Sequence, residues 1–285
     1  MPSFVDLHTH TTVSDGGLTP AQLVRLAEER ALSAVAITDH DSVAGVEEAQ
    51  AAADGLDIEV ISGIEMSADF EGEMHILGMF VDPYAAILQG AMHDMGMWRA
   101  ERNEHMLSRL ADLGMENCRE AVLEMTDGRM DRVGRMHMAL ALAESGAVAS
   151  TGEAFKRYLV STGEAYVPRK RFSPQKCIEI IKASGGYAFL AHPCYSQKSS
   201  DKLAPLVEEL MSYGLDGIEC YHSSQPHDYS EQCLKLCKQY DLMVSGGSDF
   251  HGENRPGVQL GCAFDGRYID FDILQNIKDK IGIMA

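Results

Sequence analysis

The sequence predicts an α/β protein whose strands form a mainly parallel sheet or barrel. Three observations lead to this fold class. Short apolar runs of strand length alternate with amphipathic segments of helical periodicity, an order typical of parallel sheets. Some runs, such as SAVAIT, are apolar without interruption, as in strands buried on both faces. With 285 residues, 45% of them hydrophobic, the chain is long enough to bury a large core.

The boundaries of the helices follow from their capping residues. The helix 19–32 begins with Thr19, a favoured N-cap residue, and Pro20 at the first helical position. The helix 173–186 begins in the same way, with serine and proline, and ends in glycine. Further helices are predicted at 203–213, 228–240 and about 271–281. The runs that we predict to be strands lie at 3–8, 33–38, 58–66, 73–81, 187–192, 217–222 and 242–249.

The alternation is interrupted between residues 85 and 165. This stretch has no clear strand run and holds nine of the sixteen methionines and the only tryptophan. Within it, a helix over 102–114 would place Met106, Leu107, Leu110 and Leu113 on one face. We therefore predict a barrel domain made of residues 1–84 and 166–285, and a helical insertion at 85–165 that forms a lid or substrate subdomain.

Composition restricts the class of function. The net charge of −19 disfavours a surface that coats nucleic acid, because such binding needs many lysine and arginine contacts to phosphate. It leaves a small phosphorylated ligand open. No apolar stretch approaches the roughly 18 residues of a membrane helix, and strand-like residues begin too early for a signal peptide. The seven cysteines form no C-x-x-C pair, which indicates reduced thiols and a cytoplasmic protein.

Metal-capable side chains gather at the ends of the predicted strands. Only His75 lies nearer to the start of its strand than to the end. In a parallel barrel the carboxyl ends of all strands meet on one face, so these residues would share a small volume. Without a thiolate cluster, a metal here would be held by imidazoles and carboxylates. The residues in question are His8, His10, Asp39, His40, Asp41, Glu65, His75, His192, His222, Asp249 and His251.

The motifs DLHTHTTVSDG, ITDHDSVAG, GIEMS, MHILGMF, AHP and GSDFH resemble those of the PHP domain, named for polymerase and histidinol phosphatase. The closer resemblance is to stand-alone bacterial PHP phosphoesterases, and it extends over nearly the whole chain. It implies a distorted (β/α)7 TIM-like barrel with an inserted helical subdomain and two or three divalent metal ions. Mn²⁺, Fe²⁺ or Zn²⁺ would suit such ligands, with Mg²⁺ as a further option.

The resemblance also implies three ligand sets, with no ligand of the family pattern missing. One metal would be bound by His8, His10, Glu65 and Asp249. A second would share Glu65 and take His75 and His192. A third would take Asp15, His40 and His251, with the short loop 9–15 bringing Asp15 back beside His10.

The predicted chemistry is attack of a metal-bridging hydroxide on a small phosphate ester, without a covalent phosphoenzyme. The substrate would be a nucleotide or sugar phosphate, cleaved as a monoester or a cyclic diester. His222 is the first candidate for the proton donor to the leaving group, with Asp15 and His40 as alternatives; an orienting role for His222 is equally open.

Arginine-rich segments in this acidic chain are candidates for binding the substrate phosphate, because a guanidinium pairs with phosphate through two hydrogen bonds. Related stand-alone enzymes place an arginine and a histidine on the substrate side at the GRMH position, which corresponds to Arg135 and His137. Lys170 and Arg171 are weaker candidates, as is Arg255.

Other functions remain open at this point. One is a 3′-5′ exonuclease or oligonucleotide phosphoesterase, which the net charge disfavours. A second is a metal-dependent module that binds a nucleotide without hydrolysing it. A third is a C–N hydrolase, since similar barrels host that chemistry. The sequence leaves the oligomeric state undetermined.

Overall fold

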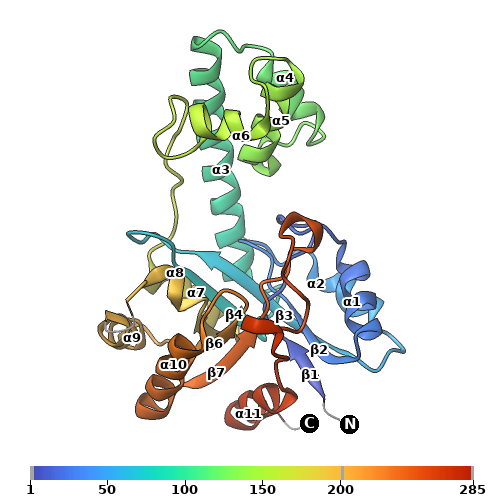
Figure 1. Ribbon diagram of the computed structural model, residues 1–285, viewed down its shortest axis with the longest axis vertical. Coiled ribbons are helices and arrows are strands. Elements are labelled where there is room, and N and C mark those ends of the chain that lie inside the picture. The colour runs from blue at the N-terminus through green and yellow to red at the C-terminus, as the bar shows by residue number, and fades with distance from the viewer. Residues whose placement is uncertain (1–2, 200–201, 284–285) are drawn as a thin grey trace. The chain divides into compact units, whose positions relative to one another are not determined.

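The computed structural model describes residues 3–199 and 202–283, which form two compact units (Figure 1). One unit comprises residues 1–89 and 172–285 and contains every strand that the structure describes. The other comprises residues 90–171 and is helical. Within the described residues, no helix is both long and apolar enough to cross a membrane.

The barrel unit is built on one seven-stranded sheet whose strands follow their order in the sequence. The first and last strands also meet. The Leu7 N–H donates to the Gly246 carbonyl at 3.1 Å, and the Asp249 N–H donates to the His8 carbonyl at 2.9 Å, so the sheet is nearly closed. The distorted barrel is therefore confirmed. Its strands are β1 Phe4–Asp6, β2 Leu32–Ile37, β3 Glu59–Ser67, β4 His75–Met79, β5 Tyr187–Leu190, β6 Gly217–His222 and β7 Met243–Gly247.

One strand is antiparallel in a sheet that is mainly parallel, as predicted. β4 runs antiparallel to both β3 and β5, whereas the other four pairings in the sheet are parallel. The connection between β3 and β4 is a short loop, and a parallel pairing needs a crossover of about a dozen residues or more. The reversal explains why His75 lies at the start of its strand and not at the end. The start of an antiparallel strand lies at the same edge as the ends of its neighbours, and His75 pairs in register with Ser67.

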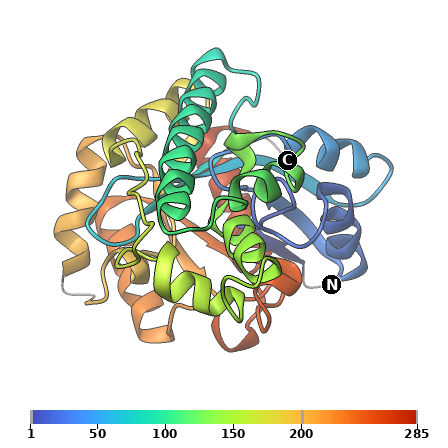
Figure 2. The ribbon, with the colours of Figure 1, turned by 90° about the horizontal axis from the view of Figure 1, so that it is seen from above.

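Helices pack around this sheet: α1 and α2 lie on one side, α9 and α10 on the other, and α11 packs against β1 and β7 between them (Figures 1 and 2). α1 begins at a capping box: Thr19 accepts from the Gln22 N–H, and the Gln22 side chain accepts from the Thr19 N–H. The side chains at the centre of the barrel are apolar, with Phe189 the largest that is fully buried. The helices are α1 Pro20–Glu29, α2 Val46–Ala52, α7 Pro174–Ala183, α8 Pro193–Ser196, α9 Leu203–Ser212, α10 His227–Tyr240 and α11 Phe271–Ile281.

The helical unit has a hydrophobic core of its own. It contains most of α3 (Ala86–Asp112), followed by α4 (Cys118–Glu124), α5 (Arg135–Glu144) and α6 (Thr151–Ala154). Met106, Leu107 and Leu110 are buried in this core, as their spacing predicts. Leu113 is 43% exposed, because α3 ends at Asp112 and the chain turns away at Gly114.

Candidate metal centre

The carboxylate of Glu65 lies at the centre of the predicted metal site. It lies in β3, has no exposed surface, and is surrounded by imidazoles from four other segments. The backbone of the chain beyond β2 pairs with β3 at this point: the Asp41 N–H donates to the Glu65 carbonyl at 2.9 Å. The nitrogens nearest to the two carboxylate oxygens are those of His8 at 3.3 Å, His10 at 3.2 Å, His40 at 2.8 Å, His75 at 2.8 Å and His192 at 2.9 Å.

Asp249 adds a second carboxylate beside the first. It follows β7 in a left-handed conformation, with φ of 59°, which aspartate tolerates better than most residues. Its Oδ1 lies 3.1 Å from Nε2 of His10 and 3.6 Å from Nε2 of His8. The close approach of β7 to His8 depends on Gly247, where a Cβ atom would lie 2.1 Å from the Cβ of His8.

Asp15 reaches the site because the loop after His10 folds back on itself. Gly16 permits this fold, since a Cβ atom there would lie 2.4 Å from the His10 carbonyl oxygen. The Asp15 carboxylate is 58% exposed and lies 3.3 Å from Nε2 of His251 and 3.8 Å from Nε2 of His40. All nine predicted metal ligands therefore lie in one cluster at one edge of the barrel.

Hydrogen bonds behind the imidazoles direct two of them toward the cluster. Nδ1 of His8 lies 3.0 Å from a carboxylate oxygen of Glu219, and Nδ1 of His251 lies 2.8 Å from the Asp249 carbonyl oxygen. Both oxygens are acceptors, so the proton of each ring is on Nδ1. In the neutral ring, Nε2 of each histidine then has the lone pair that can bind a cation.

The donor set fits a group of divalent cations. Ligand atoms about 2.1 Å from one cation lie roughly 3.0 to 3.4 Å from each other, close to the separations around Glu65. Nδ1 of His75, Nε2 of His192 and Oε1 of Glu65 form a triangle with sides of 2.8, 2.9 and 3.2 Å. Several buried polar atoms of the cluster make no hydrogen bond to any described residue: Nε2 of His8, Nε2 of His10, Nδ1 of His40 and Oε2 of Glu65.

The charged groups of the cluster shift one another's pKa values. Burial raises the pKa of Glu65, but the charges of His40 and His75 outweigh it and hold the pKa well below the ordinary 4.5. Burial lowers the pKa of His8, but the charges of Glu219 and Glu65 outweigh it and hold the pKa well above 6.5. The pKa values of His10 and His40 are raised as well, so His8, His10 and His40 hold protons that a bound cation would displace.

The structure assigns the tautomer of His222. Its Nδ1 accepts a hydrogen bond from the Ser224 N–H at 3.0 Å, so the ring proton is on Nε2, which faces Oδ2 of Asp249 at 3.3 Å. Burial lowers the pKa of His222 and favours this neutral form. A neutral imidazole that donates from Nε2 can hold a phosphoryl or carboxylate oxygen but is a poor proton donor. The geometry favours the orienting role, and the general-acid role stays a prediction.

The two roles of His222 differ in their pH dependence. If His222 only donates a hydrogen bond, we expect His222→Gln to lower kcat by about 10- to 100-fold, the worth of one hydrogen bond to a charged group. The shape of the kcat/KM profile against pH should stay the same. If His222 protonates the leaving group, the limb of the profile at high pH should disappear in the variant. Steady-state kinetics from pH 5 to pH 10 distinguish these outcomes.

The guanidinium of Arg255 forms hydrogen bonds to Asp249 and to two hydroxyl groups beside the cluster. One arm of its guanidinium bonds to Oδ2 of Asp249. The other donates to the Tyr195 hydroxyl at 2.7 Å and to the Ser224 hydroxyl at 3.1 Å. With both arms occupied, Arg255 holds Asp249 in place, and this geometry favours such a role over direct phosphate binding.

Four of the predicted substrate-binding residues belong to the helical unit: Arg135, His137, Lys170 and Arg171. Of these, Lys170 and Arg171 lie beyond the insertion as predicted, 85–165. Arg135 is the first residue of α5, and its guanidinium donates to the Leu159 carbonyl at 3.3 Å. Nδ1 of His137 accepts from the Gly134 N–H at 2.9 Å, which leaves its Nε2 as a donor. The Lys170 ammonium lies 4.4 Å from the centre of the Trp98 ring, and Arg171 is the last residue of the unit. Their role toward phosphate stays a prediction.

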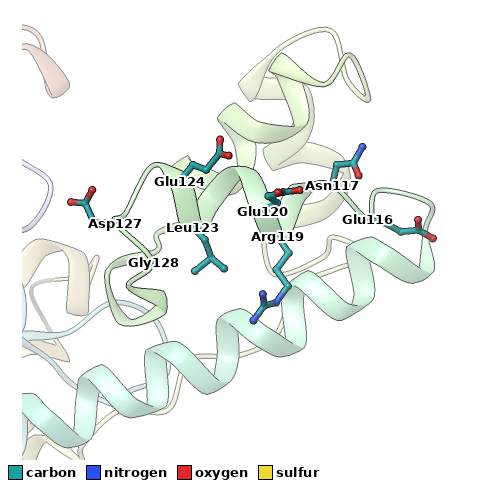
Figure 3. Close-up of a pocket in the computed structure, with 8 residues that line it drawn as sticks. All are labelled: Glu116, Asn117, Arg119, Glu120, Leu123, Glu124, Asp127 and Gly128. Atoms are coloured by element: carbon teal, nitrogen blue, oxygen red, sulfur yellow. The ribbon is translucent and has the colours of Figure 1, made fainter.

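An open hollow of about 670 Å³ on the helical unit contains none of the predicted site residues (Figure 3). Four carboxylates and one guanidinium line it, a charge balance that disfavours phosphate. Its lining residues are Glu116, Asn117, Arg119, Glu120, Leu123, Glu124, Asp127 and Gly128.

Three buried carboxylates hold segments of the cluster in place. Asp39 was predicted only as one of the metal-capable residues, and neither Asp6 nor Glu219 was assigned a role from the sequence. Asp39 accepts from the Thr11 N–H and hydroxyl, both at 2.7 Å, and so holds the loop that carries Asp15. Asp6 accepts from the Ser248 N–H at 2.9 Å and joins β1 to the segment of Asp249. Burial raises the pKa of Asp6 to about 6 against the effect of its hydrogen bonds. The third, Glu219, contacts His8. An acidic residue inside or directly after an apolar strand run is the signal that could have identified all three.

Comparison with known proteins identifies the family. The PHP domain model matches residues 6–168, more than half of the chain, so the chain belongs to the PHP domain family. A 3′,5′-nucleoside bisphosphate phosphatase from Chromobacterium violaceum is 31% identical over 262 residues, 92% of each protein. A phosphoribosyl 1,2-cyclic phosphate 1,2-diphosphodiesterase from Eggerthella lenta is 32% identical, covering 87% of this chain and 94% of that protein. A 5′-3′ exoribonuclease from Haemophilus influenzae is 34% identical, covering 86% and 89%.

Two solved structures are similar in fold to this protein over nearly the whole chain. A Chromobacterium violaceum protein described as an amidohydrolase, with bound sulfate and no metal, has a TM-score of 0.79 and 29% identity, covering 97% of each chain. A Bifidobacterium adolescentis protein, provisionally assigned as a metal-dependent phosphoesterase, has a TM-score of 0.80 and 29% identity, covering 98% of each chain. The chain is thus a hydrolase of the metal-dependent phosphoesterase class, and the non-catalytic binding module is set aside.

Proposed function

We propose that this protein hydrolyses a phosphate ester of a small nucleotide or sugar phosphate at a centre of two or three divalent cations. The proposal rests on the residues that surround Glu65. A carboxylate with no exposed surface has five imidazole nitrogens within 3.3 Å, and several buried atoms there lack a hydrogen bond to any described residue. Such a cluster is costly to bury unless cations bind it.

The ligand sets follow the three groupings around the carboxylates. His8, His10, Glu65 and Asp249 would hold one cation, and Glu65, His75 and His192 a second. Asp15, His40 and His251 would hold a third, at the exposed side of the cluster. Imidazole and carboxylate ligands together suit Mn²⁺, Fe²⁺ or Zn²⁺.

Different residues of the chain would have different roles toward the phosphate. When bound, divalent cations supply an activated water at neutral pH and neutralise charge on the phosphoryl oxygens. Glu65 would keep two ligand sets at a fixed separation through its two oxygens. His222 would donate from Nε2 to a phosphoryl oxygen of the substrate in place of Oδ2 of Asp249. The pKa of Asp15 lies below its ordinary value: burial opposes this shift, and His251 and His40 outweigh it. Asp15 is then ionised at neutral pH, which disfavours it as the proton donor.

A substrate screen tests this function. Purified protein supplied with Mn²⁺ should act on at least one of three compounds. It should release phosphate from a nucleoside 3′,5′-bisphosphate or a nucleoside 5′-monophosphate, or open a cyclic phosphate of ribose to the monoester. The names of the relatives support this choice of compounds. The Glu65→Ala variant serves as the control for contaminating phosphatases. Absence of turnover across the panel with Mn²⁺, Fe²⁺ and Zn²⁺ would overturn the proposal.

A second candidate is a 5′-3′ exoribonuclease. Three relatives, 34 to 35% identical, carry that name, and its direction is opposite to the 3′-5′ exonuclease that the sequence analysis left open. The test uses a short RNA with a 5′-phosphate and a 3′-terminal dye. An exonuclease of this kind shortens the RNA stepwise while the dye stays on the last fragment. Release of the terminal phosphate alone, with no shortening, would exclude it.

A further inference from the structure

Glu219 is a buried carboxylate that the proposed ligand sets leave unused. It lies inside β6, in the run GIECYH, and has no exposed surface. A charged group in such a place is costly unless neighbouring donors satisfy it. Both of its oxygens accept hydrogen bonds, and both donors belong to histidines of the cluster.

The first contact is to a ring. Oε1 of Glu219 lies 3.0 Å from Nδ1 of His8, on the side of the imidazole that faces away from Glu65. The carboxylate therefore fixes both the tautomer and the rotation of the ring, with Nε2 directed at Glu65. It also makes the imidazole a stronger base and a stronger ligand.

The second contact is to a backbone. Oε2 of Glu219 accepts from the N–H of His192 at 2.6 Å. His192 has a φ of 26°, a conformation that non-glycine residues rarely adopt, and it needs local support to persist. The same residue places Nε2 of its ring 2.9 Å from Glu65 and 3.2 Å from His75.

Glu219 could instead be a ligand itself, because it forms a compact group with His8 and His222. Two hydrogen bonds argue against that alternative. Nδ1 of His8 must keep its proton to donate to Glu219, and Nδ1 of His222 accepts from the Ser224 N–H, so Nε2 of His222 must carry its proton. Neither imidazole then has a lone pair facing Glu219.

We propose that Glu219 is a positioning residue that aligns two different ligand sets at once, through the ring of His8 and the backbone of His192. This inference rests on the proposed metal centre. Only a group with two acceptor oxygens serves both donors. A glutamine offers one oxygen and one NH₂ group, which would face an N–H at one of the two contacts.

The test is Glu219→Gln, with metal binding as the readout. Wild-type and variant protein are stripped of metal and titrated with Mn²⁺, while electron paramagnetic resonance reports the free ion. We expect the Kd of more than one site to rise by about 10- to 100-fold, as for other partners behind metal ligands. With saturating Mn²⁺, most of the activity should return. Glu59→Gln is the matched control: it makes the same change in β3, where Glu59 pairs with Lys278.

Metal affinities equal to those of the wild type, or to those of Glu59→Gln, would overturn the proposal. If Glu219→Gln does not fold, Glu219→Asp answers the question: its shorter side chain keeps the charge but reaches only one of the two donors. We expect it to weaken Mn²⁺ binding, and wild-type affinity in that variant would also overturn the proposal. A wild-type protein that binds Mn²⁺ tightly but hydrolyses nothing would contradict the proposed function alone.

Discussion

The Glu65→Ala variant is expected to lose at least about 10²–10³-fold in kcat, the loss typical of removing one preorganised group that stabilises charge. The reason is geometric: this carboxylate lies within 3.3 Å of imidazoles from both of the first two ligand sets. The fold should persist, because His8 and His40, whose pKa values Glu65 raises, can lose their protons once the carboxylate is gone. Steady-state kinetics with saturating Mn²⁺, together with circular dichroism, measure the two effects.

Glu59→Gln is again the appropriate control, since it alters the same strand at its opposite end, where Glu59 is 41% exposed. It should keep wild-type kcat. A Glu65→Ala variant that retains activity within tenfold of the wild type would contradict the role given to this residue. So would a variant that fails to fold even in the presence of metal.

Removal of metal is expected to lower the thermal stability substantially. Cations that bind only the folded state at about 1,000 times their Kd contribute roughly 4 kcal/mol. For a chain of this size, that corresponds to a fall in Tm of about 10 °C on treatment with a chelator. Differential scanning calorimetry of chelated and Mn²⁺-loaded protein measures the shift. Identical Tm values would contradict a built metal centre.

The difference in Tm should also depend on pH in a defined direction. In the metal-free protein, burial lowers the pKa of His10, but the nearby carboxylates of Asp249 and Glu65 outweigh it and raise that pKa. Burial likewise lowers the pKa of His8, but Glu219 and Glu65 outweigh it and raise that pKa too. The contribution of both histidines to stability is present below pH 6.5 and is lost as the pH rises. The depressed pKa values of Glu65 and Asp249 make their contribution disappear as the pH falls through the acidic range.

Metal-free protein should therefore be most stable between about pH 5 and 6. Cation binding must displace the histidine protons, so it strengthens as the pH rises. The gain in Tm on adding Mn²⁺ should grow between pH 5.5 and pH 8. A gain that shrinks over this range would contradict the exchange of protons for cations.

Most of the fold can be predicted from periodicity and capping, because each strand and helix leaves a local signal. All seven predicted strands are present, and α1 begins at the Thr19–Pro20 cap. The short helix α2, Val46–Ala52, is too brief to show a periodic pattern. The mainly parallel sheet was predicted without a direction for β4, although the few residues between β3 and β4 could have revealed it, since no crossover helix fits there.

The cluster itself was predictable because imidazoles and carboxylates at strand ends are conspicuous in an apolar context. The carboxylates behind it were not assigned, because their role depends on pairings that only the closed barrel creates. Asp6 accepts from Ser248 and Gly261, far along the chain, and Glu219 contacts the distant His8. Likewise, the tautomer of His222 depends on the Ser224 N–H, which no sequence pattern specifies.

The most direct measurement is an anomalous diffraction map from crystals of this protein grown with saturating Mn²⁺. The account predicts two or three Mn²⁺ peaks, of which two contact the carboxylate of Glu65 and one of these also contacts Nε2 of His8. A map with no peak at Glu65, or with a single peak bound elsewhere on the chain, would contradict it.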